Sequence, residues 1–159
     1  MAGMRGGIPQ LRTMMTHGSL HLWILAALLG AMGCVTTPEA PRMCLDIEAS
    51  ANLNQFEGQP HVVVLYFYPL QNQASFQRAD LRQLVNGDKP SGLTGDRWEA
   101  TVLPGQRIAL EEQLPRETAF VGVVADFYKR PNRAVIEPSC GWFGGEKIVL
   151  SATDMQVAN

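Results

Sequence analysis

The hydrophobic pattern of the chain changes near residue 42. Before that position, residues 20–34 form one apolar run, LHLWILAALLGAMGC. After it, short segments alternate between apolar and polar side chains and are separated by residues that favour turns. Alternation with a period of two is typical of strands that bury one face against a core. The sequence therefore predicts a β domain over residues 43–159, preceded by a segment of a different kind.

The turn signals divide this domain into six to eight short strands. Residues 61–70, HVVVLYFYPL, are apolar on both faces, which predicts a central strand that is covered on each side and ended by Pro69. The segments 98–103 and 106–114 flank Pro104-Gly105 and are predicted to form a hairpin. The remaining predicted strands are 43–49, 118–128 with a bulge or close backbone approach at Gly122, 134–136 at an edge, and 146–152 with 155–157 as one bent strand or two short ones.

One helix is predicted among the strands. Asn72 can cap a helix over residues 73–84, whose inward side chains are Phe76, Ala79, Leu81 and Leu84. Short strands spaced by turns, with a single helix between them, indicate an all-β fold. The predicted architecture is a two-sheet antiparallel sandwich with one short inserted helix.

The N-terminal segment is typical of a secretory signal peptide over residues 1–33. Arg5 and Arg12 precede the apolar run, and no acidic residue accompanies them. The run is shorter than the roughly 20 apolar residues that span a bilayer as a helix. Ala31-Met32-Gly33-Cys34 is similar to a bacterial lipobox, in which the cysteine sulfur takes a diacylglycerol and becomes the new N-terminus. The alternative is an ordinary secretory signal cleaved near Gly33, with Cys34 an incidental thiol.

The residues after Cys34 predict how such an anchor is used. Val35 rather than Asp follows the cysteine, which favours the outer membrane over retention at the inner one. Residues 34–42 contain proline and threonine and have no apolar period, so they are predicted to be a flexible tether. Several acyl chains on one terminus anchor more durably than a single chain does. The expectation is a domain attached to outer-membrane lipid through acylated Cys34.

Charge and cysteine content narrow the class of protein. Removing residues 1–33 takes away two of the 13 basic residues and none of the 15 acidic ones, which leaves a net charge of −4. Without a basic stripe, the domain is not predicted to bind nucleic acid. If Cys34 carries lipid, Cys44 and Cys140 remain as an even pair in an oxidising compartment, where a disulfide is the default. The alternative is two separate free thiols.

The domain carries no pattern that indicates catalysis. His61 is the one histidine after residue 33, and no metal-binding or phosphate-binding motif is present. Glu111 and Glu112 are adjacent on a predicted strand and therefore point to opposite faces. Cys140 with His61 superficially suggests a cysteine nucleophile, but the signature has the wrong order and a disulfide partner is available. The sequence predicts no enzyme, no metal site and no cofactor.

The order of these features resembles the TssJ lipoproteins of the bacterial type VI secretion system, also called the VasD/Lip family. The features are the lipobox, then VVVLYFYPL, the insertion NQASFQRADLRQL, LPGQRIALEE, FVGVVADFY and a terminal KIVLSATDMQV. The resemblance implies a transthyretin-like two-sheet sandwich with an added helix, on the periplasmic face of the outer membrane. It also implies binding to the periplasmic C-terminal region of TssM, with TssL in the TssJLM membrane complex.

The same resemblance implies where a partner binds. In that family the loop between the first two strands is important for binding TssM, and here it corresponds to residues 51–59. The predicted contact residues are Asn54, Gln55, Phe56 and Glu57. Two other functions stay open: a lipoprotein that binds a small ligand or glycan, with Trp142 and Phe143 as a stacking platform, and a pilotin-like assembly factor.

Overall fold

The structure of the protein is a computed structural model that describes residues 39–141 and 145–158. The predicted signal peptide, the lipidation site Cys34 and most of the predicted tether lie outside the described residues, as do Trp142 and Phe143. Within the described ranges, no helix is long and apolar enough to cross a membrane.

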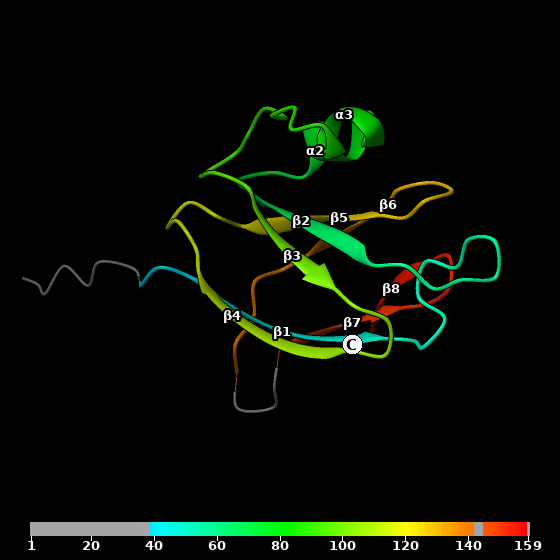
Figure 1. Ribbon diagram of the computed structural model, residues 1–159. Coiled ribbons are helices and arrows are strands. Elements are labelled where there is room, and N and C mark those ends of the chain that lie inside the picture. Colours follow the sequence, from blue (N-terminus) through cyan, green and yellow to red (C-terminus); the bar gives the residue numbers. More distant parts are fainter. Residues whose placement is uncertain (1–38, 142–144, 159) are drawn as a thin grey trace, which may run out of the picture. The chain divides into compact units, whose positions relative to one another are not determined.

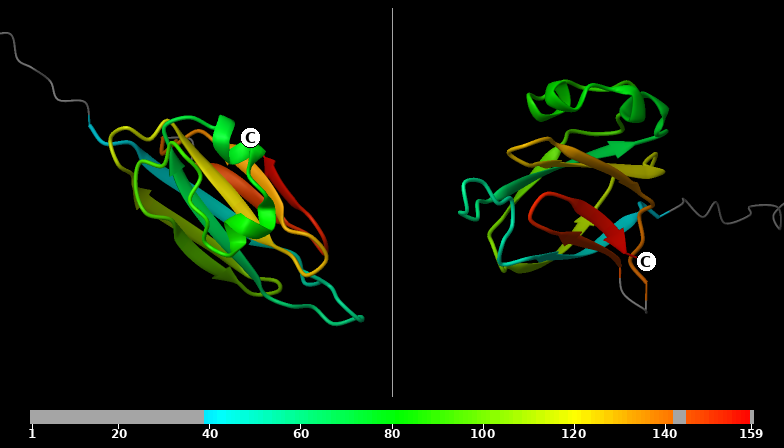
Figure 2. Two further views of the ribbon diagram at one scale, coloured as in Figure 1. Left: turned by 90° about the horizontal axis from the view of Figure 1, so that it is seen from above. Right: turned by 90° about the vertical axis from the view of Figure 1, so that its right-hand side faces the viewer.

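Strands dominate the described part of the chain (Figure 1). In chain order the elements are β1 (Arg42–Ala49), β2 (Val63–Leu70), α2 (Ala74–Arg78), α3 (Leu81–Val85), β3 (Trp98–Val102), β4 (Arg107–Gln113), β5 (Phe120–Asp126), β6 (Asn132–Ile136), β7 (Glu146–Leu150) and β8 (Met155–Ala158). One sheet has the strand order β4-β1-β7-β8 and the other β3-β2-β5-β6. The two sheets face each other, and the helices cover the outer face of the second sheet (Figure 2). The predicted all-β sandwich is confirmed.

One pairing departs from the predicted antiparallel arrangement. β1 runs parallel to β7, with Leu45 opposite Glu146 and Ala49 opposite Leu150, whereas its other neighbour, β4, is antiparallel. The remaining neighbours in both sheets pair antiparallel. Because β1 and β7 are far apart in the sequence, their parallel pairing brings the segment before β7 back to the start of β1.

The main core lies between the two sheets. Met43, Leu45, Ile47 and Ala49 are buried along β1, and the residues between them are only half-buried, as the alternation predicted. The facing sheet contributes Val63, Leu65 and Phe67 from β2 and Val121, Val123 and Ala125 from β5. Full burial of one large apolar side chain contributes about 1.5–3 kcal/mol. This core therefore provides most of the driving force for folding.

A second apolar cluster lies between β2, β5 and the helices. It contains Tyr68, Leu70, Phe76, Leu84 and Val124, all of which are buried. A Cβ at Gly122 would lie 2.5 Å from the Phe76 ring, so only glycine lets the helix approach the sheet so closely. The regular register of β5 with both neighbours leaves no bulge at Gly122. The predictions of a doubly covered central strand and of a close approach at this glycine are confirmed.

The prediction of one helix over residues 73–84 is wrong, because Asp80 divides that segment into α2 and α3. The Asp80 carboxylate accepts hydrogen bonds from the backbone N–H groups of Arg82 and Gln83, at 2.9 and 3.1 Å. It thereby caps α3, and Ala79 adopts an extended backbone between the helices. Aspartate favours such caps over helix interiors. Asn72 is not a cap, since α2 starts after Gln73 without a side-chain cap.

Two arginines hold the C-terminal ends of the helices. Arg97 donates from Nη1 to the carbonyl oxygens of Leu84 and Val85, at 3.0 and 3.2 Å, and its guanidinium lies over the Tyr66 ring. Arg133 on β6 donates to two carbonyl oxygens of α2. The last carbonyls of a helix have no partner inside it, and a cation there is favourable. The helices are therefore fixed to the sheet by charge as well as by packing.

The predicted hairpin of residues 98–103 and 106–114 is wrong, because β3 and β4 belong to different sheets. The Gln106 N–H donates to the Leu103 carbonyl at 3.1 Å, and Gly105 has a φ of 72°. A Pro-Gly turn with positive φ at the glycine is typical of type II, whose twist splays the flanking strands instead of pairing them. The turn therefore carries the chain from one sheet to the other.

Pro69 does not end its strand, which runs through Leu70. The Pro69 carbonyl accepts from the Thr94 N–H at 2.9 Å, on the side that faced β3 as far as the pair of Phe67 with Trp98. The nitrogen and carbonyl of one strand residue point to the same side, so the missing N–H of Pro69 faces the loop and not β5. Pairing with β5 therefore continues past the proline.

Candidate partner-binding site

Four connections gather at one end of the sandwich, where β1 ends and β2 begins (Figure 1). They are residues 50–62, 103–106, 127–131 and 151–154, and we call them the loop end. Backbone hydrogen bonds join three of them: the Gln55 N–H donates to the Ala152 carbonyl at 2.9 Å, and the Gly105 N–H donates to the Ser50 carbonyl at 3.0 Å. Arg42, where β1 starts, pairs with Gln113 at the opposite end of the sheet.

Asn54 fastens the predicted binding loop to the rest of the domain. Its side chain is buried, with 7% of its surface exposed. The side-chain amide donates to the Val62 carbonyl at 2.8 Å, and its oxygen accepts from the Tyr128 N–H at 2.8 Å. Its φ of 49° is a left-handed conformation that asparagine tolerates better than most residues. The structure therefore places Asn54 inside the domain, as a positioning residue for both loops.

The other predicted contact residues form a small hairpin at the tip of the loop. Phe56 and Gln59 exchange two backbone hydrogen bonds of 2.9 Å. Between them, Glu57 and Gly58 have φ values of 50° and 79°. Two positive φ values in a two-residue turn are typical of type I′, whose twist matches the paired strands. Gln55 and Glu57 are exposed on this hairpin, and Phe56 is half-buried.

The loop end also collects the exposed apolar side chains. Phe56 contacts Tyr128, with ring centroids 3.7 Å apart, and Tyr128 is 63% exposed. Val62 directly precedes β2, and Leu103 directly follows β3; they are 44% and 51% exposed. These three are all of the large, exposed apolar residues in the described part of the chain. We call Phe56, Val62, Leu103 and Tyr128 the apolar patch.

Sequence reasoning found Phe56 but missed the other members of the apolar patch. Val62 and Tyr128 were assigned to apolar strands, and Leu103 to the last position of a strand that ends at Val102. Each lies just beyond the end of a strand, where the alternation continues although the partner strand has stopped. Strand ends are the least certain part of a pattern, so the sequence held no clear signal for these positions.

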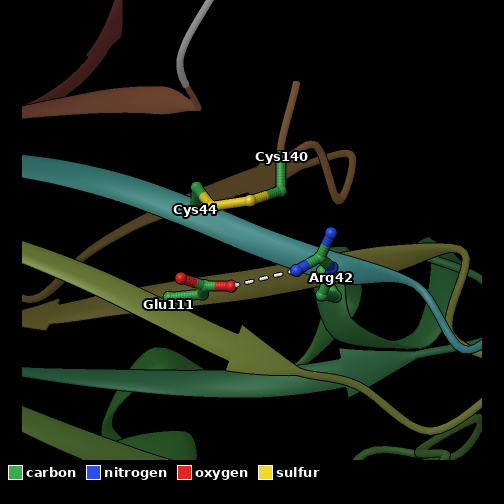
Figure 3. The surroundings of a disulfide bond; sticks show 4 residues. All are labelled: Arg42, Cys44, Glu111 and Cys140. Carbon is green, nitrogen blue, oxygen red and sulfur yellow. Dashed lines mark hydrogen bonds and ion pairs between the residues drawn. A yellow bond between two sulfur atoms is a disulfide. The ribbon is translucent and has the colours of Figure 1, made fainter. Parts of the chain in front are cut away.

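The disulfide predicted between Cys44 and Cys140 is present at the opposite end (Figure 3). The two Cα atoms lie 4.8 Å apart, and the Cys44 N–H donates to the Ser139 carbonyl at 2.8 Å. Arg42 and Glu111 form an ion pair of 3.3 Å beside it. Because both sulfurs are bonded to each other, the cluster with Glu111 offers no thiolate ligands to a metal ion. For the same reason Cys140 cannot act as a nucleophile with His61, which lies at the loop end.

A comparison of the sequence with models of protein families identifies the family of this chain. The family model described as type VI secretion lipoprotein, with the names VasD, EvfM and TssJ, matches residues 41–137. The match covers more than half of the chain. This protein belongs to the TssJ family. The members of this family are structural lipoproteins of a secretion system. As a member of that family, the protein is a structural component and not an enzyme.

Solved structures show a similar fold. TssJ1 from Pseudomonas aeruginosa has 24% sequence identity and a TM-score of 0.65, and the match covers 75% of this chain and 95% of that one. Lip from Serratia marcescens, described as a membrane-bound component of the type VI secretion system, has 20% identity and a TM-score of 0.64 over 76% and 97% of the two chains.

A third match comes from a structure described as the TssM C-terminal domain (869–1107) from EAEC. The matched chain has 25% identity and a TM-score of 0.64, and the match covers 75% of this chain and 98% of that one. No curated protein sequence matches the chain significantly.

Proposed function

We propose that this TssJ-family protein is a docking component of the type VI membrane complex, held by lipid on Cys34 at the periplasmic face of the outer membrane. Its loop end binds the periplasmic C-terminal region of TssM, in a complex that includes TssL. The observation that supports this function is the apolar patch: Val62, Leu103 and Tyr128 lie at one end of the sandwich together with Phe56.

The position of this patch suits a protein anchored by its N-terminus. β1 starts at Arg42 and ends at Ala49, beside the loop end. Eight strand residues span roughly 25 Å at about 3.3 Å per residue. The described chain therefore enters the domain at the end opposite the apolar patch.

The chemistry of the patch suits a protein partner. Exposed aromatic side chains contribute a large share of interface energy, and a buried tyrosine anchor is worth about 2 kcal/mol or more when truncated. Asn54 and the type I′ turn hold Phe56 and Tyr128 in place before binding. Such preorganisation reduces the entropy that is lost when the complex forms.

The comparison with the EAEC structure gives further support. The match covers 75% of this 159-residue chain and 98% of the matched chain. The matched chain is therefore much shorter than the TssM segment 869–1107 that the description names. The structure that contains this matched chain is described by the name of a TssM segment. We transfer that partner to this protein on the basis of family membership.

The decisive test is co-purification of the full-length lipoprotein with the periplasmic region of TssM from the native host. Deleting residues 51–59 is too severe, because Leu53 belongs to the core. The double variant Phe56→Ala with Tyr128→Ala removes the aromatic contact and keeps the backbone. The matched control is Arg116→Ala, an exposed residue at the opposite end.

We expect the double variant to reach the outer membrane in normal amounts and to lose TssM, while the control retains it. Undiminished co-purification by the double variant would exclude the apolar patch from the interface. A Cys34→Ser variant tests the anchor separately, because it should leave the membrane fraction. Mass spectrometry of the native protein should find acylated Cys34 at its N-terminus.

A further inference from the structure

A group of arginines lines a groove between the helices and the connection from β5 to β6. Arg78 and Arg82 come from α2 and α3, and Arg130 and Arg133 come from the facing connection and the start of β6. Asp80 and Pro131 also line the groove. Arg78, Arg82 and Arg130 are exposed, whereas Arg133 is half-buried because it caps α2. We call this the arginine groove.

The charge of the groove is not satisfied within the domain. Among the described residues, no acidic side chain forms an ion pair with Arg78, Arg82 or Arg130. Asp80 is the one carboxylate of the lining, and its oxygen already accepts from two backbone N–H groups of α3. The groove therefore concentrates positive charge on a domain whose net charge is negative.

The groove is continuous with the loop end. A neighbouring surface pocket has a lining that includes Arg82, Asp126, Tyr128, Lys129 and Pro131. Pro131 lines both hollows. A segment that leaves the apolar patch at Tyr128 can therefore enter the arginine groove without crossing another element.

We propose that the arginine groove binds an acidic, extended segment of the protein that docks at the loop end. This inference rests on the proposed docking function and adds the chemistry of a second contact. Guanidinium groups pair with carboxylates through two parallel hydrogen bonds, so several arginines in a row suit a run of Asp or Glu residues. Opposite charges along the two partners also speed their encounter and fix their register.

An anionic membrane surface fits the groove less well. The part of the chain that follows residue 33 carries a net negative charge, which opposes adsorption to anionic headgroups. The groove also adjoins the loop end, and β1 begins at the opposite end. The occupant we assign is therefore a protein segment, and lipid is an outcome that the test can reveal.

The test measures binding of a fluorescein-labelled octaglutamate peptide to the full-length lipoprotein in a neutral detergent, by fluorescence anisotropy. The variant is Arg82→Gln with Arg130→Gln. Its matched control is Arg42→Gln with Arg116→Gln, which removes the same charge at the opposite end of the sandwich. The loss of two exposed ion pairs should weaken binding of the peptide about tenfold.

We expect the peptide to bind the unchanged protein and the control equally, and the groove variant about tenfold more weakly, with binding lost at high salt. Equal binding by variant and control overturns the proposal. The proposal is also overturned if the protein binds phosphatidylglycerol vesicles through the same arginines and does not bind the peptide. Competition by inorganic phosphate as strong as that by unlabelled peptide also overturns it, because it indicates a general anion site.

This result is independent of the test of the docking function. If the Phe56 and Tyr128 double variant keeps TssM while the groove variant loses the peptide, the docking function fails and the acid-binding groove remains. If the groove variant alone weakens capture of TssM, and more at low salt than at high salt, the acidic segment belongs to TssM itself.

Discussion

The two ends of the sandwich are fastened in different ways. At the end where β1 starts, which we call the stapled end, a disulfide joins Cys44 to Cys140 beside the Arg42–Glu111 ion pair. At the loop end, hydrogen bonds of Asn54 and the contact between Phe56 and Tyr128 hold the segments together. The exposed, large apolar residues of the described chain lie at the loop end.

Under the proposed function, the loop end binds TssM, and the chain enters the domain at the stapled end. A covalent bond keeps residues 138–141 on β1 under all conditions that leave the disulfide oxidised. The loop end is held by hydrogen bonds and an aromatic contact, which keep Phe56 and Tyr128 in position. Binding residues are often carried on connections that a rigid scaffold positions in this way. The predictions below test this difference between the two ends.

The largest effect is expected at the stapled end. The bond between Cys44 and Cys140 closes a loop with a sequence separation of 96 residues. Removing it with Cys44→Ser and Cys140→Ser should lower the free energy of unfolding by about 4 kcal/mol in the chain-entropy model. Urea unfolding of the solubilised lipoprotein measures this loss, and the unchanged protein in a reducing agent should show the same loss.

The same double variant should still bind TssM when it is folded, because the hydrogen bonds and the aromatic contact of the loop end are unchanged. Loss of TssM binding by the folded fraction would show that the two ends are coupled. An unfolding midpoint equal to that of the unchanged protein would show that the disulfide does not stabilise the domain.

The next effect is expected from Asn54→Ala at the loop end. The substitution leaves the Val62 carbonyl and the Tyr128 N–H without their partners, at a cost of about 1–3 kcal/mol. It also frees the two loops that carry the apolar patch, so TssM binding should fall more than stability alone explains. Asn52→Ala is the control, since Asn52 is exposed in the same loop. Equal co-purification of TssM by the two variants would argue against a positioning role.

A smaller, stabilising effect is expected at the tip of the loop. Glu57 has a φ of 50° at the first central position of the type I′ turn, where asparagine is favoured. Glu57→Asn should raise the free energy of unfolding by about 0.5–1 kcal/mol, because it relieves this strain. Thermal unfolding measures the gain. The control Glu57→Gln should give no gain, since glutamine has the same difficulty at positive φ.

The fold was largely predictable because its signals are local and repeated. The alternation of Met43, Leu45 and Ile47 and the doubly apolar HVVVLYFYPL each specify which faces are buried. What failed depended on single residues with two possible roles. Asp80 can sit on a helix or cap a new one, and Pro104-Gly105 can close a hairpin or splay two strands. The pairing of strands that are distant in the sequence decides between these roles. A local pattern carries no information about that pairing.

The site was less predictable because it is assembled from four connections. The binding loop was predicted through family resemblance, and within that predicted loop Asn54 lies inside the domain while Phe56 lies against Tyr128. Tyr128 is 72 positions away from Phe56 in the sequence numbering, on the far side of β5. The arginine groove likewise joins residues of the helices to residues near β6. Such groupings follow from the register between β2, β5 and β6, which the sequence did not reveal.

The smallest effect concerns pH at the part of β1 that approaches the loop end. Glu48 lies between Lys147 and Arg107, at 2.7 and 2.8 Å. Hydrogen bonds from Lys147 and Arg107, together with their charges, lower the pKa of Glu48 from 4.5 to about 2. A carboxyl group with a lowered pKa in the folded state stabilises that state above its unfolded pKa. This contribution is therefore complete above pH 4.5 and is lost as the pH falls toward 2.

Glu48→Gln should accordingly lower the melting temperature slightly at neutral pH, and the difference from the unchanged protein should disappear near pH 2. Glu112→Gln is the control, because Glu112 forms no ion pair among the described residues. A difference that persists at the acid limit would show that Glu48 acts by packing and not by charge. Because the disulfide at the stapled end does not titrate, acid should loosen the Glu48 side of β1 before it affects Cys44. Hydrogen exchange along β1 can follow that order directly.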